Sequence, residues 1–130
     1  MSAKGPTPFN SIYAATKYGL AGFTHSLRVE LHGTGVHAGV VCPGFVSEGM
    51  WGRTGLKAPA VLKEVTAGQV VRGVMKAMGG AGEVLVTAGP VRPLLALFQM
   101  FPGLEGMMMR RTGVVRVLAE RAELAESGDS

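Results

Sequence analysis

Two residues near the start of the sequence, Tyr13 and Lys17, have the types and the spacing of a proton-transfer pair. They lie in "NSIYAATKYGL", residues 10–20, a stretch whose pattern predicts the start of a helix. Side chains four positions apart share one face of a helix, and an ammonium beside a phenol favours the phenolate. The pair is therefore able, in principle, to move a proton to or from the oxygen of a carbonyl or an alcohol. The alternative is two ordinary residues that share an exposed face.

The helix that carries this pair is predicted over residues 12–32. One face has large apolar side chains at steps of three and four, namely Leu20, Phe23, Leu27 and Leu31. A second face has a seam of small residues, which we call the small-residue seam: Ala15, Gly19, Gly22 and Ser26. We expect the apolar face to be packed and the seam to admit another backbone closely. Gly33 and Gly35 are expected to end the helix.

The elements that follow predict a parallel α/β arrangement. Residues 36–42, "VHAGVVC", are nearly all apolar and predict a strand that is buried on both faces, and "EVLVTAG", residues 83–89, predicts a second. Between them Thr66 is expected to cap a helix that ends near Met78, with Val70, Val71, Val74 and Met78 on one face. Residues 94–101 predict a further helix, which Pro102 stops, and residues 114–126 predict an amphipathic one.

A proline–glycine pair, Pro43-Gly44, follows directly after the first predicted strand. Ligands of open α/β sheets bind at the carboxyl ends of the strands. A glycine at that place lets the backbone approach a flat ring. Two strands alone cannot form the core of a doubly wound domain, so the chain has the pattern of part of a larger fold.

Taken together, "YAATK" (13–17), "VHAGVVCPGFV" (36–46) and "GEVLVTAG" (82–89) resemble the C-terminal half of the short-chain dehydrogenase/reductase family. The resemblance implies the C-terminal part of a Rossmann-type, doubly wound parallel sheet. Residues 1–130 would form a single partial domain, in which residues 90–126 are a helical region that covers the substrate. The family's glycine-rich phosphate loop and active-site asparagine belong to its N-terminal half. Its serine would fall just before Met1, so either Met1 is an internal residue of a longer protein or the gene is truncated.

The resemblance also implies the roles of individual residues. Tyr13 would be the catalytic acid and base, and Lys17 would activate it and bind the nicotinamide ribose of NAD(P)(H). Pro43, Gly44 and Val46 would lie against the nicotinamide, with the Val46 backbone on its carboxamide. The family has threonine where this chain has Glu48, so either Ser47 replaces the threonine hydroxyl or the loop is displaced. The implied reaction interconverts a carbonyl and an alcohol, on a small and, from the apolar C-terminal region, lipophilic substrate.

Composition excludes several other classes of protein. Among 130 residues the net charge is only +4 and aromatic residues make up 6%, which argues against a nucleic-acid-binding face. Cys42 is the single cysteine, so no intrachain disulfide or thiolate metal site is expected, and no metal site is predicted. Apolar runs are far shorter than the roughly 20 residues of a membrane span, and the start has no secretory pattern. These features suit a cytoplasmic protein.

A second hypothesis from the sequence is a truncated, catalytically inactive chain or an interaction module. With much of the parent sheet outside the chain, strand edges and apolar faces would be open to a partner. In the family the helix that carries the tyrosine commonly forms a dimer interface. The same is expected here for the small-residue seam, so a homo-oligomer is predicted for the full-length protein.

Overall fold

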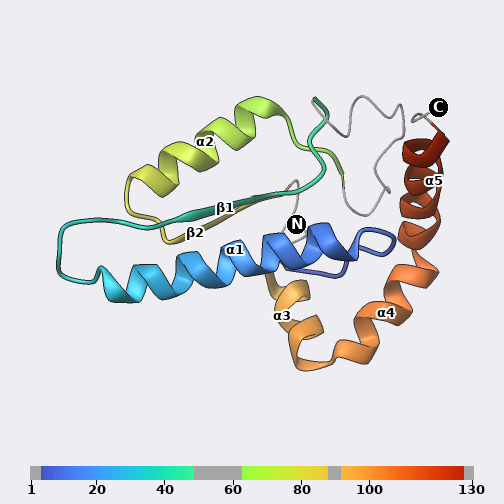
Figure 1. Ribbon diagram of the computed structural model, residues 1–130, viewed down its shortest axis with the longest axis horizontal. Helices are drawn as coiled ribbons and strands as arrows, with labels where there is room; N and C mark the ends of the chain where they lie inside the picture. The colour runs from blue at the N-terminus through green and yellow to red at the C-terminus, as the bar shows by residue number, and fades with distance from the viewer. Residues whose placement is uncertain (1–3, 49–62, 88–91, 128–130) are drawn as a thin grey trace.

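The computed structural model describes residues 4–48, 63–87 and 92–127 of the chain (Figure 1). The elements in these ranges are α1 (Ser11–Glu30), β1 (Val40–Pro43), α2 (Ala67–Met78), β2 (Glu83–Val86), α3 (Arg92–Met100), α4 (Pro102–Arg111) and α5 (Val114–Ser127). Strands β1 and β2 pair in parallel, with Val40 opposite Glu83 and Cys42 opposite Leu85. The α/β prediction is confirmed: within the described ranges the chain has the two-stranded parallel sheet and the helices of a partial Rossmann-like fold.

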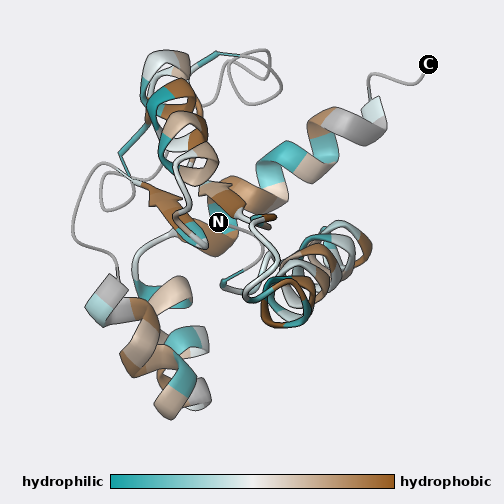
Figure 2. Cartoon of the chain, turned by 90° about the vertical axis from the view of Figure 1, so that its left-hand side faces the viewer, coloured by the Kyte–Doolittle hydropathy of each residue, from teal (hydrophilic) through white to brown (hydrophobic). Residues whose placement is uncertain are grey.

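The sheet lies between two helices that cross its opposite faces (Figures 1 and 2). Helix α2 packs along both strands, and α1 lies on the other side. The carboxyl ends of the strands and the amino-terminal half of α1 lie toward the same end of the molecule (Figure 1). The connection from β1 through α2 to β2 is the crossover unit that parallel strands require.

Local signals located the ends of α1 and α2 to within two residues, but α3 begins two residues before its predicted start and α4 was not predicted. Helix α1 stops after Glu30, and Gly33 and Gly35 both have φ +80°, a backbone conformation that glycine adopts without steric cost. Thr66 is the N-cap of α2 and forms a full capping box with Gln69. The Thr66 hydroxyl accepts from the Gln69 amide, and the Gln69 side chain accepts from the Thr66 amide.

The face on which α1 packs differs from the prediction. Leu20 and Phe23 are 54% and 64% exposed, whereas Ala21 is buried. The neighbouring His25 reaches β2, where its Nε2 lies 2.9 Å from Oε2 of Glu83. Arg28, seven residues after Ala21, lies against the backbone of Gly82. Helix α1 therefore contacts the strands through a face between its two predicted faces, because two long polar side chains find their partners there.

The first strand is shorter than predicted and is not buried on both faces. It begins at Val40, where the Val40 amide donates to the carbonyl of Gly82, and residues 36–39 have no strand opposite them. Val40 and Val41 are half-buried, and Cys42 is buried. The partner strand starts only after the turn at Gly80, so pairing cannot begin earlier. The second strand is described as far as Val86, and residues 88–89 of its predicted range lie outside the described residues.

Helix α2 packs on the sheet through a glycine. A Cβ atom on Gly73 would lie 2.5 Å from Cγ2 of Val86 and 3.4 Å from Cγ1 of Val41, so only a glycine allows this close approach. Three of the four residues predicted to form the packed face, Val71, Val74 and Met78, are instead exposed. The packed face is thus offset from the apolar stripe.

The C-terminal part forms three consecutive helices, in which α4 packs on α3 and on α5. Phe101 precedes Pro102, and Pro102 opens α4 as a first-turn proline. The buried residues fall into two groups, one at the sheet (Ala21, Cys42, Val65, Val86) and one among the C-terminal helices (Leu95, Val114, Leu118). None of the described helices has the length and apolar character needed to cross a bilayer.

Candidate active site

The pair Tyr13–Lys17 lies in the first two turns of α1 and is held together by the helix. Lys17 Nζ lies 5.1 Å from the centre of the Tyr13 ring, over its face. This is the distance of a cation–π contact. Both side chains are half-buried. The predicted juxtaposition of ammonium and phenol is therefore present, with the amine over the ring.

Backbone hydrogen bonds hold the loop that follows β1. The Gly44 amide donates to the carbonyl of Val86 over 2.9 Å, which extends the pairing of the two strands by one residue. The Val65 amide then donates to the Phe45 carbonyl, and the Ser47 amide donates to the Val65 carbonyl. Val65 is fully buried, so the loop after β1 is bonded to a residue of the core.

This pairing turns the backbone of one residue, Val46, outward. The direction of its amide and carbonyl decides whether the loop can bind the carboxamide of a nicotinamide. Val46 forms a parallel bridge with Val65, and both bonds of that bridge are made by its neighbours, Phe45 and Ser47. In such a bridge the amide and carbonyl of the central residue point to the opposite edge. Val46 thus presents one donor and one acceptor side by side, as a carboxamide requires, and the loop fits the group.

Glu48 bonds to the start of α2, and Ser47 bonds to Glu48. The Ser47 hydroxyl donates to Glu48 Oε2 over 2.8 Å, and the same oxygen accepts from the Ala67 amide over 2.9 Å. These two bonds lower the pKa of Glu48 below its ordinary value. Glu48 therefore caps the N-terminus of α2, where a carboxylate is favoured. This capping contact explains why an acidic residue, Glu48, lies next to the loop after β1.

A second cluster links the N-terminal loop to the sheet and was missed from the sequence. Glu83 Oε2 lies 2.7 Å from Lys4 Nζ and 2.9 Å from His25 Nε2. Burial alone raises the pKa of Glu83, but the hydrogen bond and charge of Lys4, together with His25, outweigh it and lower the pKa. The cluster anchors the segment that leads into Tyr13. The separation of 79 positions between Lys4 and Glu83 leaves no local signal in the sequence.

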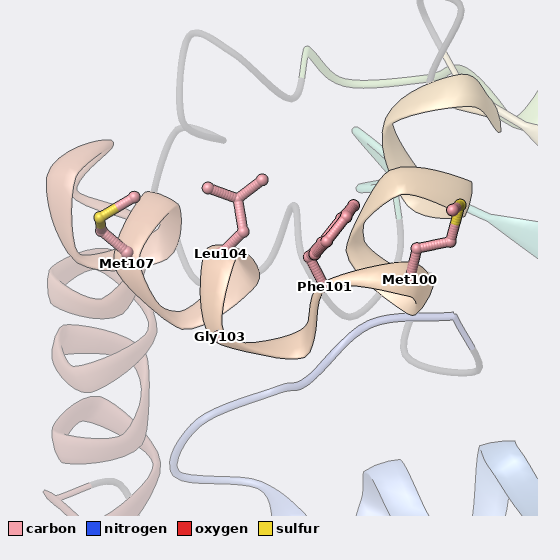
Figure 3. Close-up of a pocket in the computed structure, with 5 residues that line it drawn as sticks. All are labelled: Met100, Phe101, Gly103, Leu104 and Met107. Carbon is pink, nitrogen blue, oxygen red and sulfur yellow. The ribbon is translucent and has the colours of Figure 1, made fainter.

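The C-terminal helices carry a shallow apolar hollow at the corner between α3 and α4 (Figure 3). Its lining consists of Met100, Phe101, Gly103, Leu104 and Met107. On another side of α4, Glu105 Oε1 lies 2.9 Å from the position that a Cβ atom on Gly5 would take. Burial and the charge of Glu105 raise the pKa of Tyr18, so α4 also faces α1.

Among the described residues no group of three or more His, Cys, Asp or Glu side chains has the arrangement of a metal site. Cys42 is buried, and burial raises the pKa of its thiol. The groups that can do chemistry at the strand ends are thus a phenol, an amine and the outward backbone of Val46. They lie toward the carboxyl end of the parallel strands of a Rossmann-like fold, where such folds bind their ligands.

Comparison with known proteins agrees with this class. Residues 1–58 match the family model "short chain dehydrogenase", and this segment contains Tyr13, Lys17 and the loop after β1. The chain belongs to the short-chain dehydrogenase/reductase family.

Two curated relatives extend the match beyond that segment. The ketoacyl reductase HetN of Nostoc sp. is 38% identical over 130 residues, which cover 95% of this chain and 45% of that protein. An uncharacterised oxidoreductase of Mycobacterium tuberculosis is 33% identical over 97 residues, which cover 72% of this chain and 36% of that protein. The chain therefore spans less than half the length of these relatives. No solved structure gives a significant match.

Proposed function

We propose that the protein containing this chain is a cytoplasmic, NAD(P)-dependent oxidoreductase that interconverts a carbonyl and an alcohol. The family and the names of the relatives support an oxidoreductase of the short-chain dehydrogenase type. The observation that carries the proposal is the Tyr13–Lys17 pair on α1, at the end of the sheet where the loop after β1 turns the Val46 backbone outward.

In the proposed reaction Tyr13 donates or accepts the proton. In the direction of reduction its hydroxyl donates a hydrogen bond to the carbonyl oxygen and then transfers the proton to it. The positive charge of Lys17, one turn along the helix, stabilises the phenolate that remains. A bound reduced nicotinamide supplies the hydride. Oxidation of an alcohol reverses these steps, with Tyr13 accepting the proton.

The loop after β1 is the proposed nicotinamide support. Pro43 and Gly44 would lie against the ring, and the Val46 amide and carbonyl would bind its carboxamide. Lys17 would also hold the hydroxyls of the nicotinamide ribose. Ser47 remains a proposed contact, although its hydroxyl would first have to leave Glu48, which it binds at 2.8 Å.

The proposed substrate is a lipophilic carbonyl compound or the corresponding alcohol. The name of the Nostoc relative, a ketoacyl reductase, favours a carbonyl on an acyl chain. Residues 92–127, the helical region after the sheet, are the proposed cover of the substrate, as the family resemblance implies.

Binding of NADPH and NADH, measured by fluorescence titration, tests the cofactor assignment separately from catalysis. Replacement Lys17→Met keeps the length of the side chain but removes the charge and the donors to the ribose, so the affinity should fall about tenfold or more, the loss of one charged hydrogen bond. Arg72→Met, an equal loss of charge on the exposed surface of α2, is the matched control and should leave the affinity unchanged. Equal titration curves for Lys17→Met and the unaltered protein would contradict the ribose assignment.

A second candidate function is an interaction module without catalytic activity. It is favoured by the open surface of α1, where Cβ atoms added to Gly19 or Gly22 would meet none of the described residues within 4 Å. Gel filtration combined with the cofactor titration separates the two candidates. Association without binding of either cofactor, measured on the natural gene product that contains these 130 residues, would support the interaction module, whereas cofactor binding would support the oxidoreductase.

A further inference from the structure

The corner between α3 and α4 exposes large apolar side chains that the fold does not cover. Met100 is 73% exposed and Phe101 55% exposed, and Leu97 and Met107 are also exposed. Met100, Phe101 and Met107 border the shallow hollow seen in Figure 3, together with Gly103 and Leu104. Four of these residues are methionine or leucine, whose flexible side chains adapt to a fluid partner. Exposed apolar patches of this kind mark contact sites.

The charged side chains on the outer surface of this corner are positive. Arg110 and Arg111 occupy the last turn of α4 and are both exposed. Glu105, the acidic residue of α3 and α4, is directed toward Gly5 in the N-terminal loop, and burial raises its pKa. The outer surface of the corner therefore combines apolar side chains with positive charge and has its carboxylate turned away.

The positions along α4 place these groups together. Gly103, Met107 and Arg110 are spaced by four and three residues, so they share the face opposite Glu105, and Leu104 and Arg111 lie one residue further round. Apolar residues beside arginines on one helix face are the pattern of a helix that lies in a membrane interface. At 9 and 10 residues, α3 and α4 are of a length to rest on a bilayer rather than cross it.

We propose that the α3–α4 corner docks on a membrane surface that carries anionic lipids. Met100, Phe101, Leu104 and Met107 would enter the boundary between headgroups and acyl chains. Arg110 and Arg111 would bind the lipid phosphates. The two arginines favour an anionic membrane over a purely apolar partner, because an apolar partner would offer them no negative charge at the edge of the contact. The proposal involves none of the residues assigned to proton transfer or cofactor binding.

Flotation with lipid vesicles on a density gradient tests the proposal on the 130-residue chain. Vesicles of phosphatidylcholine with a quarter phosphatidylglycerol are compared with vesicles of phosphatidylcholine alone, because membrane-bound protein rises with vesicles and aggregated protein sinks. We expect flotation with the anionic vesicles, weaker flotation at high salt, and little with the neutral ones. Arg110→Gln with Arg111→Gln should lower binding about tenfold. Met100→Ser with Phe101→Ser should lower it by a similar factor.

Helix α2 offers matched controls, since it has its own exposed apolar and basic side chains. Val71→Ser with Met75→Ser removes exposed apolar surface, and Arg72→Gln with Lys76→Gln removes the same charge. Both double variants should bind anionic vesicles like the unaltered chain. The proposal is overturned if the unaltered chain does not float, if it floats equally well with neutral vesicles, or if the α2 variants lose as much binding as the corner variants. Loss of self-association on gel filtration by Met100→Ser with Phe101→Ser, without vesicle binding, would assign the corner to a second copy instead.

Discussion

At the scale of single residues, Glu83 ties together three parts of the chain that are distant in sequence. Its carboxylate binds Lys4 of the N-terminal loop and His25 of α1. Because these contacts favour the charged form, the pKa of Glu83 in the folded protein lies below its ordinary value of 4.5. Its stabilising effect is therefore complete above that ordinary value, where the unfolded chain is also ionised, and is lost as the pH falls through the lowered pKa.

The expected result is that Glu83→Gln melts at a lower temperature than the unaltered protein at pH 7. Partly exposed ion pairs contribute at most about 1 kcal/mol, so the difference should be small, and it should narrow as the pH falls below the ordinary pKa of 4.5 and through the lowered pKa of the folded protein. Thermal melts at several pH values measure it. Glu120→Gln, which breaks the exposed pair with Arg116, is the control and should have less effect at every pH. A difference that does not narrow as the pH is lowered further and further below 4.5 would contradict an ionic role for Glu83.

At the scale of elements, Gly73 sets how closely α2 approaches the sheet. Gly73→Ala should destabilise the fold, because overpacking against Val86 and Val41 costs about 1–3 kcal/mol and outweighs the gain of up to about 1 kcal/mol in helix propensity. Denaturant unfolding measures the difference. Gly68→Ala on the same helix is the control, since its Cβ would meet its nearest neighbour only at 3.9 Å. Equal or higher stability for Gly73→Ala than for Gly68→Ala would show that the interface has room.

The same scale explains what could be predicted from the sequence. The ends of α1 and α2 depend on local chemistry, such as the Thr66 capping box and the glycines after α1, and were located to within two residues. Helix α4 was not predicted, because Pro102 was interpreted only as the end of the preceding helix and not as the first residue of a new one. The spacing of Tyr13 and Lys17 is also local, so their juxtaposition was predictable. The packed faces were not, because they depend on partners far away in the chain. His25 and Arg28 pack through contacts with Glu83 and Gly82, and the bond from Ala67 to Glu48 spans 19 positions.

At the scale of the whole molecule, the small-residue seam of α1 is the proposed contact between two copies. In the part of the chain that the structure describes, a Cβ atom on Gly22 would meet nothing within 4 Å, so Gly22→Leu can be accommodated within one chain. Any change in association would then report a contact between chains. We expect Gly22→Leu to shift a dimer toward monomer in analytical ultracentrifugation. Gly68→Leu, the same substitution on exposed α2, should not, and an unchanged oligomeric state for both variants would remove the seam as an interface.

The central proposal is that Tyr13 transfers the proton in a nicotinamide-dependent reaction, and one measurement tests it most directly. The rate of NAD(P)H oxidation with a lipophilic ketone is measured for the natural gene product that contains these 130 residues, with and without Tyr13→Phe. Loss of a positioned acid should lower turnover by roughly 10²- to 10⁴-fold, while cofactor affinity stays within about a factor of two. Turnover that is unchanged in Tyr13→Phe, or absent from the unaltered protein with every carbonyl and alcohol tested, would contradict the account.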